Sequence, residues 1–96
     1  MSNETLRKRI ALISRDSARV VTISHAKKRM VQRRILLTQV LQVLNGGKVV
    51  EPAHRNIHGN WQCTLERLVA GDRIKIVAAL EERISGEHVI VITVMN

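Results

Sequence analysis

The hydrophobic pattern of this chain changes its period once, at Gly46-Gly47. Before the two glycines, apolar residues recur every three or four positions, as they do on one face of an α-helix. After them the period is two, which is typical of β-strands. The glycines themselves supply a stop for the last helix. The chain therefore predicts an α+β fold in which the helices precede most of the strands.

The first half predicts helices and one short strand. Leu6, Ile10 and Ile13 share one helix face, and the β-branched run at 20–23 is typical of a strand. Ser24 then stands where a side chain can cap the following helix. The expected elements are a helix over 4–14, a strand over 20–23, a helix from Ser24 with Ala26 and Met30 in its apolar stripe, and a helix over about 38–45.

The second half predicts four strands separated by turns. The turn signals are Gly59-Asn60, Gly71-Asp72 and Ser85-Gly86, which leave strand segments at about 48–56, 60–70, 73–80 and 88–95. Short connections imply an antiparallel meander with the helices on one side of the sheet. The segment 89–94 is apolar on both faces and is expected in the middle of the sheet. The predicted order is α-β-α-α-β-β-β-β, in a single domain over residues 1–96.

One predicted strand breaks its own alternation. Trp61, Cys63 and Leu65 share the apolar face of this strand, but the next residue on that face is Arg67. Either a bulge resets the register, or Arg67 points onto a surface that is not core.

The basic residues are concentrated towards the N-terminus. The net charge is +8; residues 1–34 hold ten bases and two acids, while the remainder holds six of each. This asymmetry favours an acidic partner, which is either nucleic acid or an acidic protein. Because Trp61 is the one aromatic residue, the chain lacks the side chains of base-stacking modules such as the RRM.

No cofactor or membrane segment is expected. Cys63 has no disulfide partner, and the longest apolar run, 89–95, is too short to span a membrane, so we expect a cytoplasmic protein. Cys63 lies on an apolar strand face and is expected to be a buried, inert thiol. His54 and His58 fall at a strand end and in a turn, too far apart to share one ion, so no metal site is expected.

A signature surrounds the second helix. The chain reads Ser24-His25-Ala26, then Arg29-Met30, then Arg33 and Ile35, which is H-A-x-x-R-M-x-x-R-x-I, and continues through Val40, Leu44 and Gly47 to Gly59-Asn60-Trp61 and Gly71. Over about residues 20–95 it resembles a family of small bacterial domains of unknown function that is related to the BrnT and RelE/ParE-like ribonuclease toxins. The resemblance implies helices packed on one face of a curved antiparallel sheet, whose other, basic face meets RNA on the ribosome.

The chain departs from the family pattern between the second and third helices. The family usually has a glycine after the second arginine and a small polar cap soon after the isoleucine, where this chain has Arg34 and Leu36. Thr38 is therefore the expected cap of the third helix. Since the catalytic groups of RelE-like toxins vary among members, the resemblance transfers no catalytic residue.

The best candidate site is a polar stripe along the second helix. His25, Arg29 and Arg33 are spaced i, i+4, i+8, which places them on one helix face. Metal-free RNA cleavage needs a general base, a proton donor for the leaving oxygen, and cations beside the phosphorane. His25, Arg29 and Arg33 are the candidate catalytic residues on this ground. The alternatives are that His25 contacts a ligand without catalysis, or that it only fixes the entry of the helix through a structural hydrogen bond.

Other cations surround this stripe. The expected phosphate contacts are Lys27, Lys28 and Arg34, together with Arg7, Lys8 and Arg9, and with Arg67 and Arg73 if these lie on the open face of the sheet. The alternative for each is an ordinary solvated surface.

These features predict a toxin-fold RNA-binding protein, with metal-independent endoribonuclease activity of a toxin–antitoxin type. The alternative is a non-catalytic basic module that binds nucleic acid or an acidic protein. Expected partners are RNA or the ribosome, an acidic antitoxin-like protein and, through the helix at 4–14, a second copy of the chain in a homodimer; no membrane partner is expected.

Overall fold

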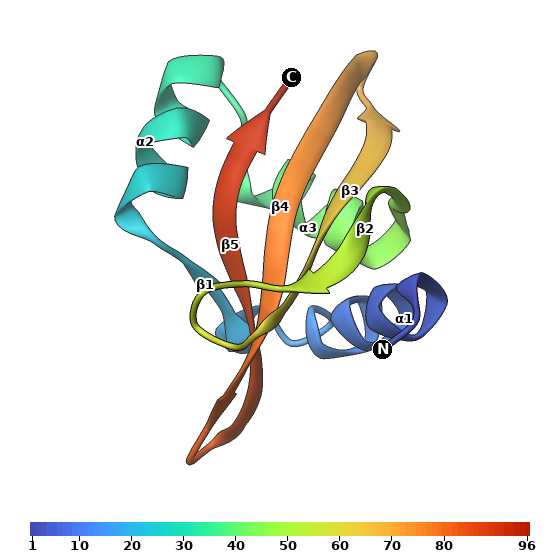
Figure 1. The fold of residues 1–96 in the computed structure, drawn as a ribbon. Helices are drawn as coiled ribbons and strands as arrows, with labels where there is room; N and C mark the ends of the chain where they lie inside the picture. Colours follow the sequence, from blue (N-terminus) through green and yellow to red (C-terminus); the bar gives the residue numbers. More distant parts are fainter.

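The computed structural model describes all 96 residues and confirms the α+β order, with the helices before the main strands (Figure 1). The elements are α1 (Asn3–Ile13), a 3-10 turn (Ser17–Arg19), β1 (Val20–Thr22), α2 (Ser24–Arg33), α3 (Leu37–Gly46), β2 (Lys48–Arg55), β3 (Trp61–Val69), β4 (Asp72–Arg83) and β5 (Gly86–Met95). None of the helices is long and apolar enough to cross a membrane.

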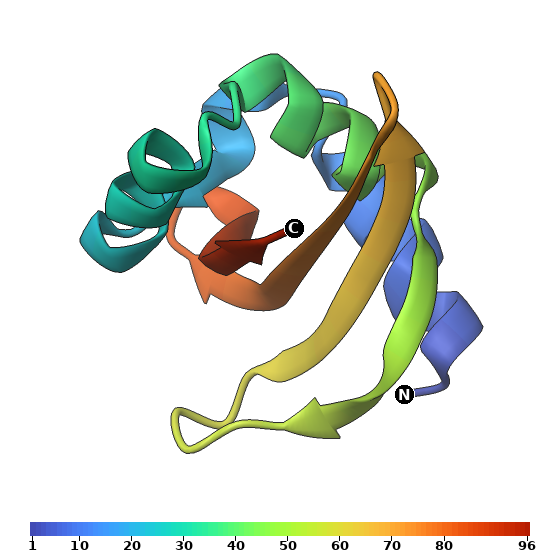
Figure 2. The same cartoon turned by 90° about the horizontal axis from the view of Figure 1, so that it is seen from above.

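The strands form one five-stranded sheet in the order β1-β5-β4-β3-β2. From β2 to β5 the strands are antiparallel, as the short turns predict, and β5 lies inside the sheet as its apolar sequence predicts. The short β1 pairs parallel with β5, so the sheet is mixed. Seen from above, β3 and β4 curve strongly along their length (Figure 2).

One face of the sheet carries the core. α1 and α3 lie against this covered face and leave the other face uncovered; in Figure 1, α3 is seen behind the strands and α1 at the lower right. The largest fully buried side chains are Leu6 and Ile10 from α1, Val40, Val43 and Leu44 from α3, and Leu65, Ile74, Ile76, Val89, Val91 and Val94 from the strands. Each such burial stabilises the fold by about 1.5–3 kcal/mol.

α2 lies along β5, beside the part of the strand that β1 does not reach. β1 pairs only over Val20–Thr22, and the chain then turns into α2. Ala26 is fully buried, which lets the helix approach β5 closely. The expected cap by Ser24 is wrong, because Ser24 is the first residue of the helix and Ile23 precedes it without a side-chain cap.

The turn between α2 and α3 contains a strained residue. Arg34 has φ 55° and ψ 43°, the left-handed conformation that glycine adopts most readily. The N–H of Arg34 donates to Val31 O and that of Ile35 donates to Met30 O, at 3.3 and 2.9 Å. This is the Schellman arrangement of a helix end, in which glycine is the commonest residue at the left-handed position.

The start of α3 also differs from expectation. Thr38 is not the cap, because the helix begins at Leu37 and the side-chain oxygen of Gln39 accepts the N–H of Leu36 at 2.8 Å.

Arg67 lies on the covered side of the sheet, between the buried Leu65 and Val69 on the same face of β3. The pairing of β3 with β4 is continuous through Arg67 and Ile74, so no bulge resets the register there. The exposed Arg67 side chain reaches α3 and donates from Nη1 to Gln42 O at 2.8 Å. A cation at the last turn of a helix is favourable, because it hydrogen-bonds one of the last carbonyls and interacts favourably with the helix dipole.

Candidate functional site

One long side of α2 is polar and open to solvent. Because successive helical residues are turned by about 100°, His25, Lys28, Arg29 and Gln32 fall on one side. These four side chains line a concave surface of about 340 Å³. No aspartate or glutamate occurs between Asp16 and Glu51, so no acidic side chain of α2 opposes its lysines and arginines. We call this surface the polar side of α2.

His25 joins the polar side to the uncovered face of the sheet. Its Nε2 lies 3.2 Å from the hydroxyl oxygen of Thr93, which is 68 residues away in the sequence. Thr93 pairs with Val77 of β4. When Nε2–H donates to the threonine, the lone pair of Nδ1 is free to accept a proton. The contact therefore orients the imidazole, while the threonine hydroxyl can pair with either tautomer because it can donate or accept.

The structure brings together two of the three candidate catalytic residues. His25 and Arg29 line the same concave surface. Arg33 does not line it, since eight residues of helix separate Arg33 from His25 by about 12 Å along the axis. The surface at His25 is therefore shared with Arg29 and not with Arg33.

The basic residues of α1 and α2 differ in their partners. Arg7 is paired with Glu4, Arg9 with Glu87, and Arg19 of the 3-10 turn with Asp16. The hydrogen bond and charge of Glu4 raise the pKa of Arg7, and the same contact lowers the pKa of Glu4. The α2 cations Lys27, Lys28, Arg29, Arg33 and Arg34 form no ion pair. The unneutralised charge of the N-terminal third is therefore centred on α2.

The uncovered face of the sheet carries a second set of charges that the sequence predictions missed, apart from Arg73. The Glu66 side chain is only 8% exposed, and it accepts a hydrogen bond from Arg73 Nη1 at 2.7 Å. Lys75 Nζ lies 3.9 Å from the other carboxylate oxygen. The Arg73 hydrogen bond, with the charges of Arg73 and Lys75, lowers the pKa of Glu66. Polar residues at every second position of β3 were the sequence signal of this face.

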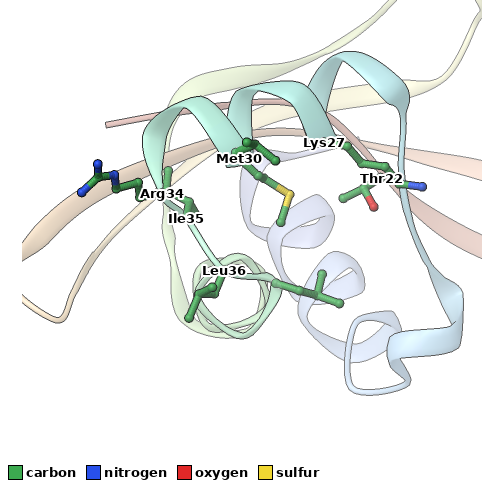
Figure 3. Close-up of a pocket in the computed structure, with 8 residues that line it drawn as sticks. Thr22, Lys27, Met30, Arg34, Ile35 and Leu36 are labelled. Carbon is green, nitrogen blue, oxygen red and sulfur yellow. The ribbon is translucent and has the colours of Figure 1, made fainter.

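The opposite long side of α2 is apolar. Together with the start of α3 it forms a groove of about 510 Å³ (Figure 3). Its lining residues are Thr22, Lys27, Met30, Val31, Arg34, Ile35, Leu36 and Leu37. The structure thus separates Lys27 and Arg34 from Lys28, although the sequence placed all three among the expected phosphate contacts. The sequence predictions did not include this groove.

The remaining candidates lie apart from α2. His54 Nδ1 is 3.1 Å from Pro52 O, and His58 lies in the turn between β2 and β3. No group of three metal-ligating side chains comes together in the chain. Cys63 is buried, and burial raises the pKa of its thiol to about 11. The thiol is therefore protonated and unreactive near neutral pH.

Residues 22–96 match the model of a protein family described as a domain of unknown function (DUF4258). The matched segment begins at the end of β1 and contains both long sides of α2 and the whole meander, while α1 precedes it. No curated protein and no solved structure matches the chain.

Proposed function

Starting from the fact that the chain belongs to the DUF4258 family, we propose that it binds RNA through the polar side of α2 and cleaves it without a metal ion. The proposal includes a relationship to the RelE- and BrnT-like toxins, on the H-A-x-x-R-M pattern that begins at His25. The uncovered face of the curved sheet, beside α2, is the surface on which the RNA continues.

The observation that carries the proposal is the position of His25. It combines an exposed imidazole, a hydroxyl 3.2 Å from Nε2, and the guanidinium of Arg29 on the same concave surface. A phosphodiester seated there meets a base and a cation together, and no carboxylate of α2 repels it. Ionised side chains are attracted to such a group without reading its sequence, so we expect weak sequence preference.

The cleavage step uses the 2′-hydroxyl of the RNA as nucleophile. His25 Nδ1 takes the hydroxyl proton, the oxygen forms a bond to phosphorus, and the bond from phosphorus to the 5′-oxygen breaks. Water at the open surface protonates the departing 5′-oxygen, and the imidazolium returns its proton to the resulting hydroxide. The products are a 2′,3′-cyclic phosphate and a 5′-hydroxyl end. Arg29 stabilises the added charge of the phosphorane, and Thr93 positions the imidazole.

The test is cleavage of single-stranded RNA in the presence of a chelator. Exchange of His25→Ala should lower the cleavage rate by about 10²–10⁴-fold, which is the usual contribution of a general base. Thr93→Val should lower it less, because it removes the orienting contact and leaves the base. Analysis of the product ends for a cyclic phosphate checks the chemical step. Equal rates in the wild type and the His25→Ala protein would contradict the proposal.

Arg15→Gln is a matched control for charge. Arg15 follows α1, makes no ion pair, and lies outside the α2 surface. It should bind and cleave RNA like the wild type, whereas Arg29→Gln, which removes the same charge, should weaken both. An equal loss in both variants would mean that net charge, and not the polar side of α2, attracts the RNA.

A second candidate function is a non-catalytic RNA-binding module. It is favoured by the openness of the site and by the distance of Arg33 from His25, which leave one base and one cation at a single phosphate. Binding that weakens steeply with salt, without any product, would support this function.

The toxin relationship has its own test. Expression of the wild-type chain should arrest translation, and the His25→Ala chain should not. A neighbouring reading frame for a small acidic protein would further favour a toxin–antitoxin pair.

A further inference from the structure

An apolar groove lies between α2 and α3, on the side of α2 away from His25. We propose that it binds an amphipathic helix of a partner protein, whose apolar side chains enter the groove and whose carboxylates meet the cations at its ends. This proposal is independent of RNA binding, because the two surfaces share no lining residue.

The groove gathers aliphatic side chains that nothing in the molecule covers. Val31 is 80% exposed, Leu36 66% and Leu37 45%. By contrast, Ile84 is the one exposed aliphatic residue of the turn between β4 and β5. Isolated exposed apolar residues are ordinary, but a contiguous set that lines a hollow is typical of an interaction site.

The walls of the groove favour a helix as the occupant. They are formed by side chains of α2 and α3 and of the turn between them, with Thr22 at one end (Figure 3). The backbone groups of the two helices are already hydrogen-bonded. The groove therefore offers a partner side-chain contacts, and it has no long unpaired strand edge to which a β-strand could add. A helix supplies apolar anchors at every third and fourth position for such a surface.

The charges of the groove favour an acidic partner helix. Figure 3 shows Lys27 and Arg34 extending from opposite ends of the lined hollow. Neither forms an ion pair, and no acid occurs between residues 17 and 50. Apolar anchors flanked by carboxylates complement this arrangement, and a basic helix would be repelled.

The strained backbone at Arg34 supports a role for its side chain. A left-handed conformation disfavours residues with a Cβ, and glycine would relieve it. Strained residues persist where the surrounding structure holds them, and they concentrate at functional sites. Here the strained residue places its guanidinium at the end of the groove.

A second copy of the chain is a poorer occupant. Two copies would bring the basic α2 surfaces towards each other. The β4–β5 hairpin does carry Glu82 and Glu87 near an exposed aliphatic, but it offers only Ile84 to a groove with three exposed anchors. Such a contact between different surfaces would also build open chains and not a closed dimer.

The test uses a labelled synthetic helix of about 18 residues, roughly 27 Å long. Leucines occupy every third and fourth position, and glutamates fill most of the others. Fluorescence anisotropy with the full chain should show saturable binding. A peptide with lysine for each glutamate should bind at least about tenfold more weakly, and a peptide with glutamine for each leucine should not bind. Absence of binding of the leucine–glutamate peptide at about 100 μM protein would overturn the proposal.

Variants then locate the binding. Val31→Gln should weaken the peptide by about tenfold or more, because Val31 is the most exposed of the groove aliphatics. Its exposure also means that the core is untouched, which thermal unfolding verifies. Ile84→Gln exchanges a fully exposed aliphatic far from the groove and should leave peptide affinity unchanged. Equal affinity of the Val31→Gln and wild-type proteins would place the peptide elsewhere and overturn the proposal.

Two further measurements distinguish the other occupants. Self-association in sedimentation that is lost in Val31→Gln would assign the groove to a second copy. RNA affinity that falls in Val31→Gln as much as peptide affinity would assign it to RNA. Either result would overturn the acidic-helix proposal; unchanged RNA binding by a monomeric Val31→Gln protein supports it. If His25→Ala leaves RNA cleavage unaffected while Val31→Gln weakens the peptide, the proposed function fails and this inference stands.

Discussion

The two long sides of α2 both carry cations, but the side chains that surround these cations differ. Lys27 and Lys28 are neighbours in sequence and both exposed, yet Lys28 lies beside His25 and Arg29, whereas Lys27 lies at a groove with Met30. The helix rotates them apart by about 100°, and the close packing of α2 on β5 fixes which side each one faces. A run of bases on a helix is therefore not one binding surface. The neighbouring elements decide which side chains surround each cation.

Charge reversal at the two lysines should have the largest effect on this comparison. Lys28→Glu should weaken RNA binding by about tenfold or more and reduce the slope of affinity against salt by at least about one, because it removes a phosphate contact and adds a repulsion. Lys27→Glu should weaken RNA binding less, and should instead weaken the leucine–glutamate peptide more than Lys28→Glu does. Titrations of each protein with RNA and with peptide at several salt concentrations make the four comparisons.

The two reversals control each other, since both change the net charge by the same amount on exposed residues of one helix. Equal losses of RNA affinity would mean that α2 acts as a general basic surface. The distinction between its two sides would then be irrelevant to binding.

Replacement of Arg34 separates the strain of the groove from its charge. Arg34→Gly should stabilise the fold by about 1 kcal/mol, because glycine adopts φ 55° without a Cβ clash. The same change should weaken binding of the acidic peptide, since the guanidinium is lost. Arg34→Lys keeps both a Cβ and a charge, so it should match the wild type in stability and bind the peptide more tightly than Arg34→Gly.

Urea unfolding measures the stability of these proteins and anisotropy measures peptide binding. An Arg34→Gly protein that gains no stability would show that the left-handed turn costs nothing here. One that gains stability and keeps its peptide affinity would remove Arg34 from the docking surface.

The order of elements could be predicted from the sequence because each depends on local pattern. The change of period at Gly46-Gly47 separates helices from meander, and the doubly apolar run 89–94 lies inside the sheet. The parallel pairing of β1 could not be predicted in the same way, since it joins segments about 70 residues apart in the chain. Local periodicity predicts that a strand exists, but it does not identify the strand with which it pairs.

The candidate site divides in the same manner. The i, i+4 spacing of His25 and Arg29 follows from helix geometry, and the structure places both on one surface. Thr93 was missed because nothing local links it to His25. Val31 and Leu37 were missed as a groove because apolar residues on a helix ordinarily predict a buried stripe. The departure from glycine at Arg34 was the sequence signal of an unusual turn, and it needed a backbone angle to become an argument about strain.

The smallest effect is expected on the uncovered face of the sheet, where cations, unlike those of α2, have a carboxylate partner. The pKa of Glu66 is lowered in the folded protein, chiefly by the Arg73 hydrogen bond. A lowered folded pKa means that the contribution of Glu66 to stability is complete above the unfolded value of about 4.3, and is lost as the pH falls through the folded pKa. Since the Arg73 side chain is 68% exposed and the Lys75 side chain 46% exposed, solvent and salt screen the pair, and the effect is small.

Glu66→Gln should therefore unfold more easily than the wild type near neutral pH, and the two proteins should approach each other as the pH falls below about 4. Urea midpoints measured across this range test the prediction. Arg29→Gln is the comparison from α2. Because that helix has no carboxylate, loss of the Arg29 charge should leave the dependence of stability on pH, below neutral pH, parallel to that of the wild type. A Glu66→Gln curve that also runs parallel to the wild type would mean that the Arg73 contact contributes nothing. The charges of the sheet would then be as free to meet a phosphate as those on the polar side of α2.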